Sequence, residues 1–533
     1  MTIDRPTCSV RLMLQFFAVS GASMMATGSL AQTITVETQT VTHPRPPLVG
    51  GTNIQSHAGN NFVTGLSGIN FINDARAAKI PMIRMNAYPD NDNASLTQKF
   101  FDDKFDAIIR AGARPLLIQY INPFLKTQGR YLKADGTSGG TLGTNIAYLT
   151  GKYTNPSRRC GYDSTRYCFV DKLYVEIGNE PDLTVDYRVG SAQEYSNLFN
   201  EAHREISEIG TPAGALRNKV VLLGPAIAFG YRQQYFSIDS APGDPPNDYT
   251  LRNQIMEYFL TNSRNAVDIV TYHSYSDEGS SSALYDVLNQ PRQLDTKERH
   301  DRPVNFTSSG GIPTVSPSDA NNADSFRGVA AILKLMSRNI YARNGNRNYV
   351  PIGVTEHNAG GADRNGVPNP IKHTIQQGLW NLAATAFHIR SPYSALTTSF
   401  VFDDPGNNEN FGHYRPDLSK NYVYWALWMR NNATGANVLK VSGTNIPAAY
   451  GAPSLVVTAT KTGTTVYLEV INRSAAAISA TINLSGATIG QPSTVYRLDG
   501  SSSQVRTAQE NVVQGYRPTF PAYSATIYRI PIS

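Results

Sequence analysis

The fold is decided by one stretch of the sequence, Val175-Glu176-Ile177-Gly178-Asn179-Glu180-Pro181-Asp182. Side chains alternate along a strand, so Val175 and Ile177 pack outward against helices. Glu176 and Glu180 then share the inner side, and Pro181 stops the strand directly after Glu180. The carboxyl ends of the strands in a parallel barrel form the mouth at which catalytic groups gather. The stretch therefore favours a carboxylate at a barrel mouth over a helix-capping or salt-bridged glutamate.

Short apolar runs alternate with amphipathic helical patterns on both sides of this stretch, between residues 45 and 436. This alternation predicts eight strand–helix units, and eight units favour an α/β fold closed into a (β/α)8 TIM barrel. The predicted strands cover residues 48–53, 81–86, 114–120, 173–179, 220–225, 267–273, 351–356 and 395–402. The predicted helices cover residues 97–110, 192–209, 251–262, 326–344, 373–390 and 422–432.

The loops between these elements differ in length at the two ends of the strands. Connections from helix to strand are short, as at 110–113, whereas those from strand to helix are long, as at 274–324. Long loops at one end of a barrel usually shape a site. An open doubly wound sheet is the rival fold, but no G-x-G-x-x-G turn follows any predicted strand.

The periodicity changes to two after residue 437, with strands predicted at 454–459, 465–472, 478–484, 493–498 and 523–530. Such a run of short alternating strands between Gly, Asn and Ser turns predicts a C-terminal β-sandwich over residues 437–533. Residues 33–41 also alternate, so we expect the segment 32–44 to add a strand to this sandwich.

Residues 1–31 have the pattern of a secretory signal peptide. Arg5 and Arg11 precede an apolar run, and Ser29-Leu30-Ala31 matches a small-x-small cleavage site. No later segment reaches about 18 apolar residues, so we expect no membrane span after cleavage. A secreted or periplasmic protein is the expectation, with an uncleaved anchor as the alternative.

Charge and cysteine content limit the partners. The 533 residues include 47 Lys and Arg and 41 Asp and Glu, with a net charge of +6 and no dense basic run. We therefore do not expect a nucleic-acid partner. Cys160 and Cys168 are the only cysteines after the signal, and in an oxidising compartment we expect them to form a disulfide. No His spacing typical of a metal site occurs, and we expect no cofactor.

A second carboxylate ends the predicted seventh strand in Gly353-Val354-Thr355-Glu356-His357-Asn358. Glutamates at the ends of strands four and seven would face each other across a barrel mouth. That pairing suits glycoside hydrolysis, in which one carboxyl group protonates the leaving oxygen and a second carboxylate acts on the opposite side.

At this point the sequence resembles the retaining glycoside hydrolases of clan A. Within the clan it most resembles family 79, the β-glucuronidase and heparanase group, and the resemblance covers barrel and sandwich. The motifs that carry it are Glu176-Ile177-Gly178-Asn179-Glu180-Pro181-Asp182, Leu223-Gly224-Pro225 and Val270-Thr271-Tyr272-His273-Ser274-Tyr275. Families 39, 30 and 51 share much of this architecture.

The resemblance implies Glu180 as the acid/base and Glu356 as the nucleophile of a double displacement. It further implies that Asn179 binds the sugar 2-hydroxyl and that His273 or Tyr275 donates a hydrogen bond to Glu356. Arg84, at the end of the second strand, would support the nucleophile; a structural pair with Glu176 is the alternative.

Two departures from the clan pattern affect substrate binding. Many members have Trp at the end of strand eight, where this chain has Phe402-Asp403, and no clear uronate-binding motif occurs. His413-Tyr414-Arg415 is the candidate for binding a sugar carboxylate, with a solvated loop as the alternative.

We expect the protein to bind a carbohydrate and to cleave a β-linked glycoside, more specifically a glucuronide. The alternatives are a β-xylosidase or glucanase-like activity of families 39 or 30, and a non-catalytic carbohydrate-binding protein on a hydrolase fold.

Overall fold

The protein is described from a computed structural model. The residues described are 32–54, 70–90, 96–121, 128–181, 192–210, 214–227, 259, 262–263, 265–275, 306–309, 312–315, 350–358, 373–390, 394–402, 411–415, 417, 419–444, 448–449, 452–453 and 455–533. The expected signal peptide at 1–31 and the predicted helix at 326–344 lie outside these residues, as does most of the predicted helix at 251–262. In the part of the chain that is described, no helix is both long and apolar enough to span a membrane.

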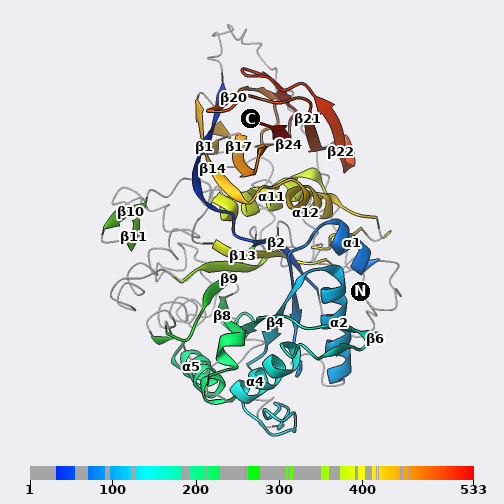
Figure 1. Ribbon diagram of the computed structural model, residues 1–533, viewed down its shortest axis with the longest axis vertical. Helices are drawn as coiled ribbons and strands as arrows, with labels where there is room; N and C mark the ends of the chain where they lie inside the picture. The colour runs from blue at the N-terminus through cyan, green and yellow to red at the C-terminus, as the bar shows by residue number, and fades with distance from the viewer. Residues whose placement is uncertain are drawn as a thin grey trace, which may run out of the picture. The chain divides into compact units, whose positions relative to one another are not determined.

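Eight parallel strands close into a barrel in the order β12-β13-β2-β3-β4-β7-β8-β9, which confirms the predicted fold class (Figure 1). Each predicted strand overlaps one of them, although several bounds differ by two or more residues. The strands are β2 (Leu48–Asn53), β3 (Met82–Asn86), β4 (Arg114–Gln119), β7 (Leu173–Ile177), β8 (Val220–Ile227), β9 (Ile269–Tyr275), β12 (Ile352–Asn358) and β13 (Ser394–Ser399).

One boundary matters for the site. Glu356 was expected to end its strand, but β12 continues to Asn358. The register with β9 shifts between Val354 and Glu356. Such an irregularity re-aims the side chain that follows it, so Glu356 is directed by a local distortion rather than by the end of the strand.

The barrel has an inner and an outer apolar layer. Its inner layer comprises Leu48, Met82, Leu116, Leu223, Ile269 and Leu396, contributed by six different strands. Outward residues pack against helices, among them α2 (Gln98–Ala111), α5 (Ala192–Glu208), α11 (Ile375–Arg390) and α12 (Tyr422–Asn432). The sequence patterns did not predict α1 (Phe71–Ala77) or α4 (Leu142–Tyr153).

The remaining long strands form one eight-stranded sheet in the order β20-β1-β14-β17-β18-β24-β21-β22. The N-terminal strand β1 pairs antiparallel with β14 and parallel with β20. Residues of β20 and β1, at one end of the order, share an apolar core with residues of β18, β24 and β21, as the two layers of a sandwich do. The strands are β1 (Thr33–Pro44), β14 (Asn437–Thr444), β17 (Leu455–Thr462), β18 (Thr465–Asn472), β20 (Thr481–Ser485), β21 (Ser493–Asp499), β22 (Ser502–Glu510) and β24 (Ser524–Pro531).

The sheet contacts two helices of the barrel. An apolar cluster joins α11 and α12 to strands of the sheet, and within it lies a buried ion pair between Arg430 of α12 and Glu469 of β18, with N and O atoms 2.7 Å apart. Arg430 also donates to the carbonyl of Leu382 in α11. Removing one partner from a buried ion pair lowers the free energy of unfolding, because it leaves an unpaired buried charge. This ion pair therefore stabilises the contact between the sheet and the barrel.

The predicted disulfide between Cys160 and Cys168 is confirmed. It closes a short hairpin, β5 (Arg159–Cys160) and β6 (Asp163–Tyr167), that precedes β7. Asp106 of α2 holds this hairpin by accepting hydrogen bonds from Arg158 and from the backbone N–H of Gly161.

Replacing both cysteines with alanine should lower the free energy of unfolding by ~2–3 kcal/mol, because the disulfide restricts the unfolded chain. Urea denaturation of the two proteins measures the difference. Thiol titration of the denatured, unreduced wild type is the control and should find no free thiol in the mature chain. Equal stabilities of wild type and variant would contradict the prediction.

Candidate active site

Arg84 of β3 points into the barrel, on the same side of the strand as Met82, and is almost completely buried. Its Nε donates to Oε2 of Glu176 at 2.6 Å, so the structural pair with Glu176, given above as the alternative, is present. Its Nη1 donates to Oδ1 of Asn53 and to Oε1 of Glu356, and its Nη2 donates to Oδ1 of Asn179 at 2.5 Å. Burial works against the charge, but Glu176 and Glu356 outweigh it and raise the pKa of Arg84. Arg84 is therefore a permanent buried cation.

Glu356 is held ionised by this cation. Its side chain retains 10% of its exposure, and Oε1 accepts from Arg84. Its other oxygen, Oε2, lies 3.5 Å from Nδ1 of His273. A carboxylate beside a fixed guanidinium is stabilised in its charged form. Glu356 thus has one carboxyl oxygen bound to Arg84 and the other near His273.

Glu180 follows the end of β7 in an unusual backbone conformation. Its φ of 48° lies in the left-handed region, and its N–H donates to the carbonyl of Ala226 at 2.9 Å. Its side chain is 19% exposed, more than that of Glu356. Non-glycine residues keep such a φ only where the surrounding structure enforces it, commonly at functional sites. The backbone therefore fixes the direction of this carboxyl group.

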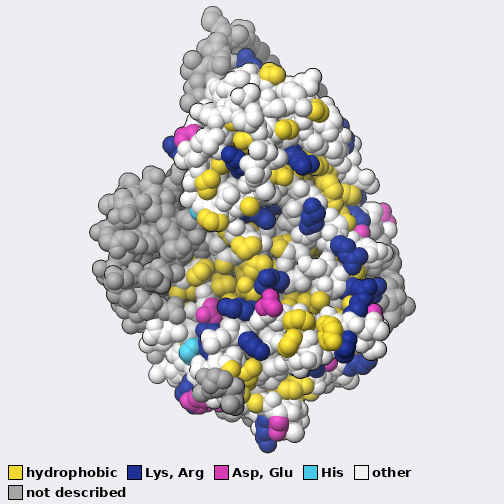
Figure 2. Space-filling model, in the orientation of Figure 1, with side chains coloured by type: hydrophobic (Ala, Val, Ile, Leu, Met, Phe, Trp, Pro, Cys, Tyr) yellow, Lys and Arg dark blue, Asp and Glu magenta, His cyan; other side chains and the backbone are white. Residues whose placement is uncertain are grey.

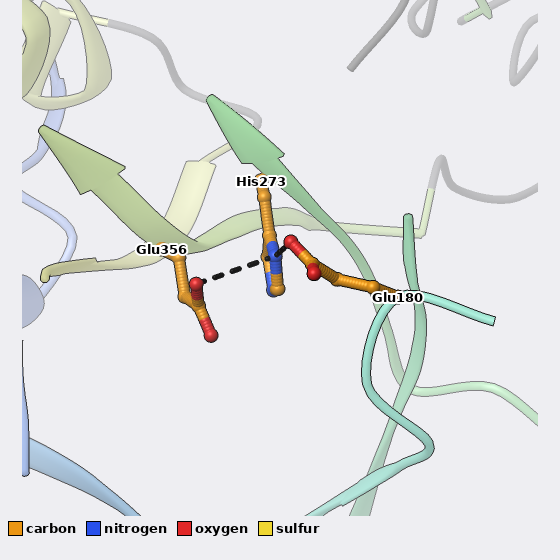
Figure 3. A group of neighbouring side chains, drawn as sticks. All are labelled: Glu180, His273 and Glu356. Atoms are coloured by element: carbon orange, nitrogen blue, oxygen red, sulfur yellow. Dashed lines mark hydrogen bonds and ion pairs between the residues drawn. The ribbon is translucent and has the colours of Figure 1, made fainter. Parts of the chain in front are cut away.

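His273 of β9 lies between the two carboxyl groups (Figure 3). Its Nδ1 is 2.8 Å from Oε1 of Glu180, and its Nε2 is 3.5 Å from Nη2 of Arg84. An arginine has only donors, so the neutral imidazole accepts at Nε2 and carries its proton on Nδ1. We expected His273 or Tyr275 to donate to Glu356. The shorter contact of Nδ1 goes to Glu180, and Oε2 of Glu356 lies farther away, at 3.5 Å.

The pKa of His273 is raised above its ordinary value. Burial alone would lower it, but the charge of Glu356 and the hydrogen bond to Glu180 outweigh burial, while Arg84 acts in the opposite direction. The imidazolium form is thus favoured by two carboxylates and opposed by one guanidinium.

The two carboxyl groups are close together. One oxygen of Glu180, one oxygen of Glu356 and one ring nitrogen of His273 all lie within 4.8 Å of one another. These are also atoms that could bind a metal ion. An ion there would have to displace the proton on Nδ1 and face the Arg84 cation, so the donor set fits acid–base chemistry better than metal binding.

Asn179 and Tyr275 complete the predicted set at the ends of β7 and β9. Asn179 is 8% exposed and its Oδ1 accepts from Arg84, so its amide N–H groups are the part available to a ligand. Tyr275 is level with Asn358 in the register of β9 and β12, and its side chain lies outside the described residues.

The tripeptide expected to bind a sugar carboxylate has other contacts. The hydroxyl of Tyr414 donates to Asp74 of α1, and Arg415 donates to Ser419 and to the carbonyl of Lys420. Burial lowers the pKa of His413 to about 3, so this ring is neutral. The described contacts therefore do not support this tripeptide as a uronate-binding motif.

Sequence reasoning missed Asn53, which ends β2. Its amide donates to the carbonyls of Thr355 and Ser399, and its Oδ1 accepts from Arg84. Asn53 thereby fixes the position of Arg84 beside Glu356. Its place at a strand end, like that of Asn179, was the available signal.

Glu176→Gln should destabilise the fold by ~3–5 kcal/mol, because it removes one anion from a buried charge pair. Urea denaturation measures this loss. Glu208→Gln is the control, since its pair with Arg204 is more than half exposed and should contribute no more than about 0.5 kcal/mol. A similar small loss for both variants would contradict the buried role of Glu176.

The stability of the protein should depend on pH through His273. Because the pKa of His273 is raised in the folded state, protonation of His273 adds to the free energy of unfolding. This contribution is complete below about pH 6.5 and is lost as the pH rises through the pKa of the folded state. The wild type should therefore exceed His273→Gln in unfolding free energy by more at about pH 5.5 than at about pH 8.5.

The control for this experiment is His43→Gln. Burial lowers the pKa of His43, so its effect on stability should have the opposite dependence on pH. If the His273 variant differed from the wild type equally at both pH values, the assigned direction of the His273 shift would be wrong.

Comparisons with known proteins support the fold. No protein-family model matches the sequence, and no curated protein matches it. Solved structures do match, each over 94% of this chain. The GH51 α-L-arabinofuranosidase from Thermotoga petrophila is 15% identical over 100% of its own length (TM-score 0.60). A family 44 xyloglucanase from Paenibacillus polymyxa is 15% identical over 99% (TM-score 0.60), and the endoglucanase Cel44A from Clostridium thermocellum is 13% identical over 99% (TM-score 0.56). The structural neighbours are thus clan A glycoside hydrolases of families 51 and 44 with the TIM-barrel fold.

Proposed function

We propose that the protein is a retaining glycoside hydrolase that uses Glu356 and Glu180. The observation that carries this proposal is the separation of their carboxyl oxygens, within 4.8 Å, with His273 between them. Retaining enzymes place the two carboxyl groups ~5–5.5 Å apart, whereas inverting enzymes need ~6.5–9.5 Å to admit a water molecule. The likeness of the fold to family 51 and 44 enzymes supports the same reaction class.

Glu356 is the nucleophile in this mechanism. The Arg84 cation keeps it ionised without a proton to remove. Its oxygen attacks the anomeric carbon as the bond to the leaving oxygen breaks, and the product is a glycosyl ester of Glu356. Water then attacks the same carbon from the opposite side and releases the sugar with net retention.

Glu180 is the acid and then the base. In the first step Glu180 acts as the carboxylic acid and gives its proton to the leaving oxygen. Once the ester forms, Glu356 is neutral and Glu180 can accept a proton from water. The hydrogen bond from Nδ1 of His273 stabilises the ionised Glu180 that exists between these two proton transfers.

The proposed substrate is a β-linked glycoside held in part by the amide of Asn179. Glucuronide specificity rests on the resemblance to family 79. The second candidate is a xylosidase or glucanase-like activity, which is favoured because a structural neighbour is described as a bifunctional glucanase-xylanase. A binding protein without activity is disfavoured, because both carboxylates and the cation beside Glu356 are present. The confirmed disulfide supports an exported protein.

Glu356→Ala and Glu180→Ala should both abolish hydrolysis, and azide should restore each in a different way. In Glu356→Ala, azide attacks the vacant face and gives a glycosyl azide of inverted configuration. In Glu180→Ala with an activated aryl glycoside, the ester still forms and azide gives the retained configuration. NMR of the products distinguishes them, and exchanged configurations would mean that the two roles are reversed.

A panel of aryl glycosides should identify the sugar. We expect turnover of at least one of the β-glucuronide, β-xyloside, β-glucoside and α-L-arabinofuranoside, and loss of that turnover in Glu356→Gln. Turnover of the glucuronide alone would support the family 79 resemblance. Turnover of the xyloside, glucoside or arabinofuranoside without turnover of the glucuronide would contradict specificity for a uronate. If none of the four glycosides is cleaved, the proposed hydrolase activity is contradicted.

A further inference from the structure

The barrel end opposite the carboxylates has an exposed cation before or at the start of four adjacent strands. Lys79 lies in the turn before β3, Arg114 is the first residue of β4, and Lys172 and Lys219 directly precede β7 and β8. We call these four residues the basic rim. Lys172 and Glu180 flank the same strand, β7, at its two ends, so the rim is separate from the candidate active site.

Three cations of the rim are level with one another. Leu116 of β4 pairs with Tyr174 of β7, which places Arg114 level with Lys172 two residues earlier. Leu173 pairs with Val220 of β8, which places Lys172 level with Lys219. Neighbouring strands are ~4.8 Å apart. The Cα positions of these three residues therefore form a row at about that spacing, and each carries a positively charged side chain.

The carboxylates near the rim do not neutralise it. Asp268 is occupied by Arg217, at 2.9 Å, and by the backbone N–H of Leu222. Asp171 is exposed beside Lys172. No ion pair joins the four rim cations to a carboxylate within the described residues, and Arg114 has a hydrogen bond to Tyr174. On the face of the molecule in view in Figure 2, Lys and Arg side chains are more widespread than Asp and Glu.

Like charges opposite one another on neighbouring strands destabilise a sheet, and no ion pair of the described residues offsets this row. We propose that the basic rim binds an anionic polysaccharide chain, one that carries carboxylate or sulfate groups. The polysaccharide would lie along the row of cations, since the spacing of neighbouring strands is close to the length of one pyranose unit in an extended polysaccharide.

Two other polyanions fit the rim less well. A membrane surface is best held by cations together with apolar anchors, and the exposed large apolar residues of the described chain, Val41, Tyr167 and Val513, are not in the rim. Single-stranded nucleic acid is held by cations together with a series of aromatic stacking platforms, and Tyr174 is the one aromatic side chain with a described contact to the rim. The proposal does not depend on the proposed catalysis, because binding at this end leaves the mouth open.

The test measures retention of the full mature chain on immobilised polygalacturonate and on heparin, with elution by NaCl. The rim variant is R114Q/K172Q/K219Q, and the matched control K133Q/R517Q/R529Q removes three exposed cations elsewhere. We expect the wild type to bind at low salt, the rim variant to bind about tenfold more weakly or worse with a shallower salt dependence, and the control to bind nearly as the wild type does. Neutral xylan should not show this salt-dependent retention.

Because Arg114 contacts Tyr174, the double variant K172Q/K219Q repeats the test without that change. No retention of the wild type, equal weakening of rim and control variants, or retention only by anionic vesicles or DNA would each overturn the proposal. Any turnover of an aryl glycoside should be unchanged in the rim variants. If the protein binds the polymers but cleaves no glycoside, the proposed binding by the basic rim is supported and only the proposed hydrolase activity is contradicted.

Discussion

The candidate active site depends on one buried cation, Arg84. A guanidinium taken out of water is unstable unless charges and acceptors replace its hydration. Here those acceptors come from three strands and their ends: Asn53 of β2, Glu176 and Asn179 of β7 and its end, and Glu356 of β12. Because each acceptor satisfies part of the same donor group, displacing one strand leaves a charge unpaired. The cation therefore joins the strands across the barrel and fixes the positions of the groups around it.

The same cation makes the two facing carboxyl groups chemically different. Glu356 contacts Arg84 directly, whereas Glu180 has its hydrogen bond from His273 and is more exposed. The backbone adds to this difference, since a register shift directs Glu356 and a left-handed φ directs Glu180. A pair of identical side chains thus acquires one form that stays charged and another whose charge can change during a reaction.

The barrel could be predicted from the sequence because its strands are short apolar runs and its helices are amphipathic. Both patterns are local. Strand parity also predicted that Glu176 points inward beside Arg84. Non-local features could not be predicted in this way. The register shift near Glu356 depends on β9, and the contact of Tyr414 with Asp74 joins residues far apart in the chain. The hydrogen bond of His273 to Glu180 depends on the backbone turn at Glu180, which no local pattern encodes.

The register of strand β7 determines both how the barrel packs and where the groups of the candidate active site lie. Val175 and Ile177 are buried in the outer core, and Glu176 is buried inside the barrel. A slip of one residue would turn every side chain to the other face, placing a carboxylate among helices and an isoleucine against Arg84. Both changes are unfavourable, because one buries an unpaired charge and the other leaves the guanidinium without its partner. The ion pair that supports the site thus also selects the register that places Glu180 at the mouth, so fold specificity and site geometry follow from the same contact.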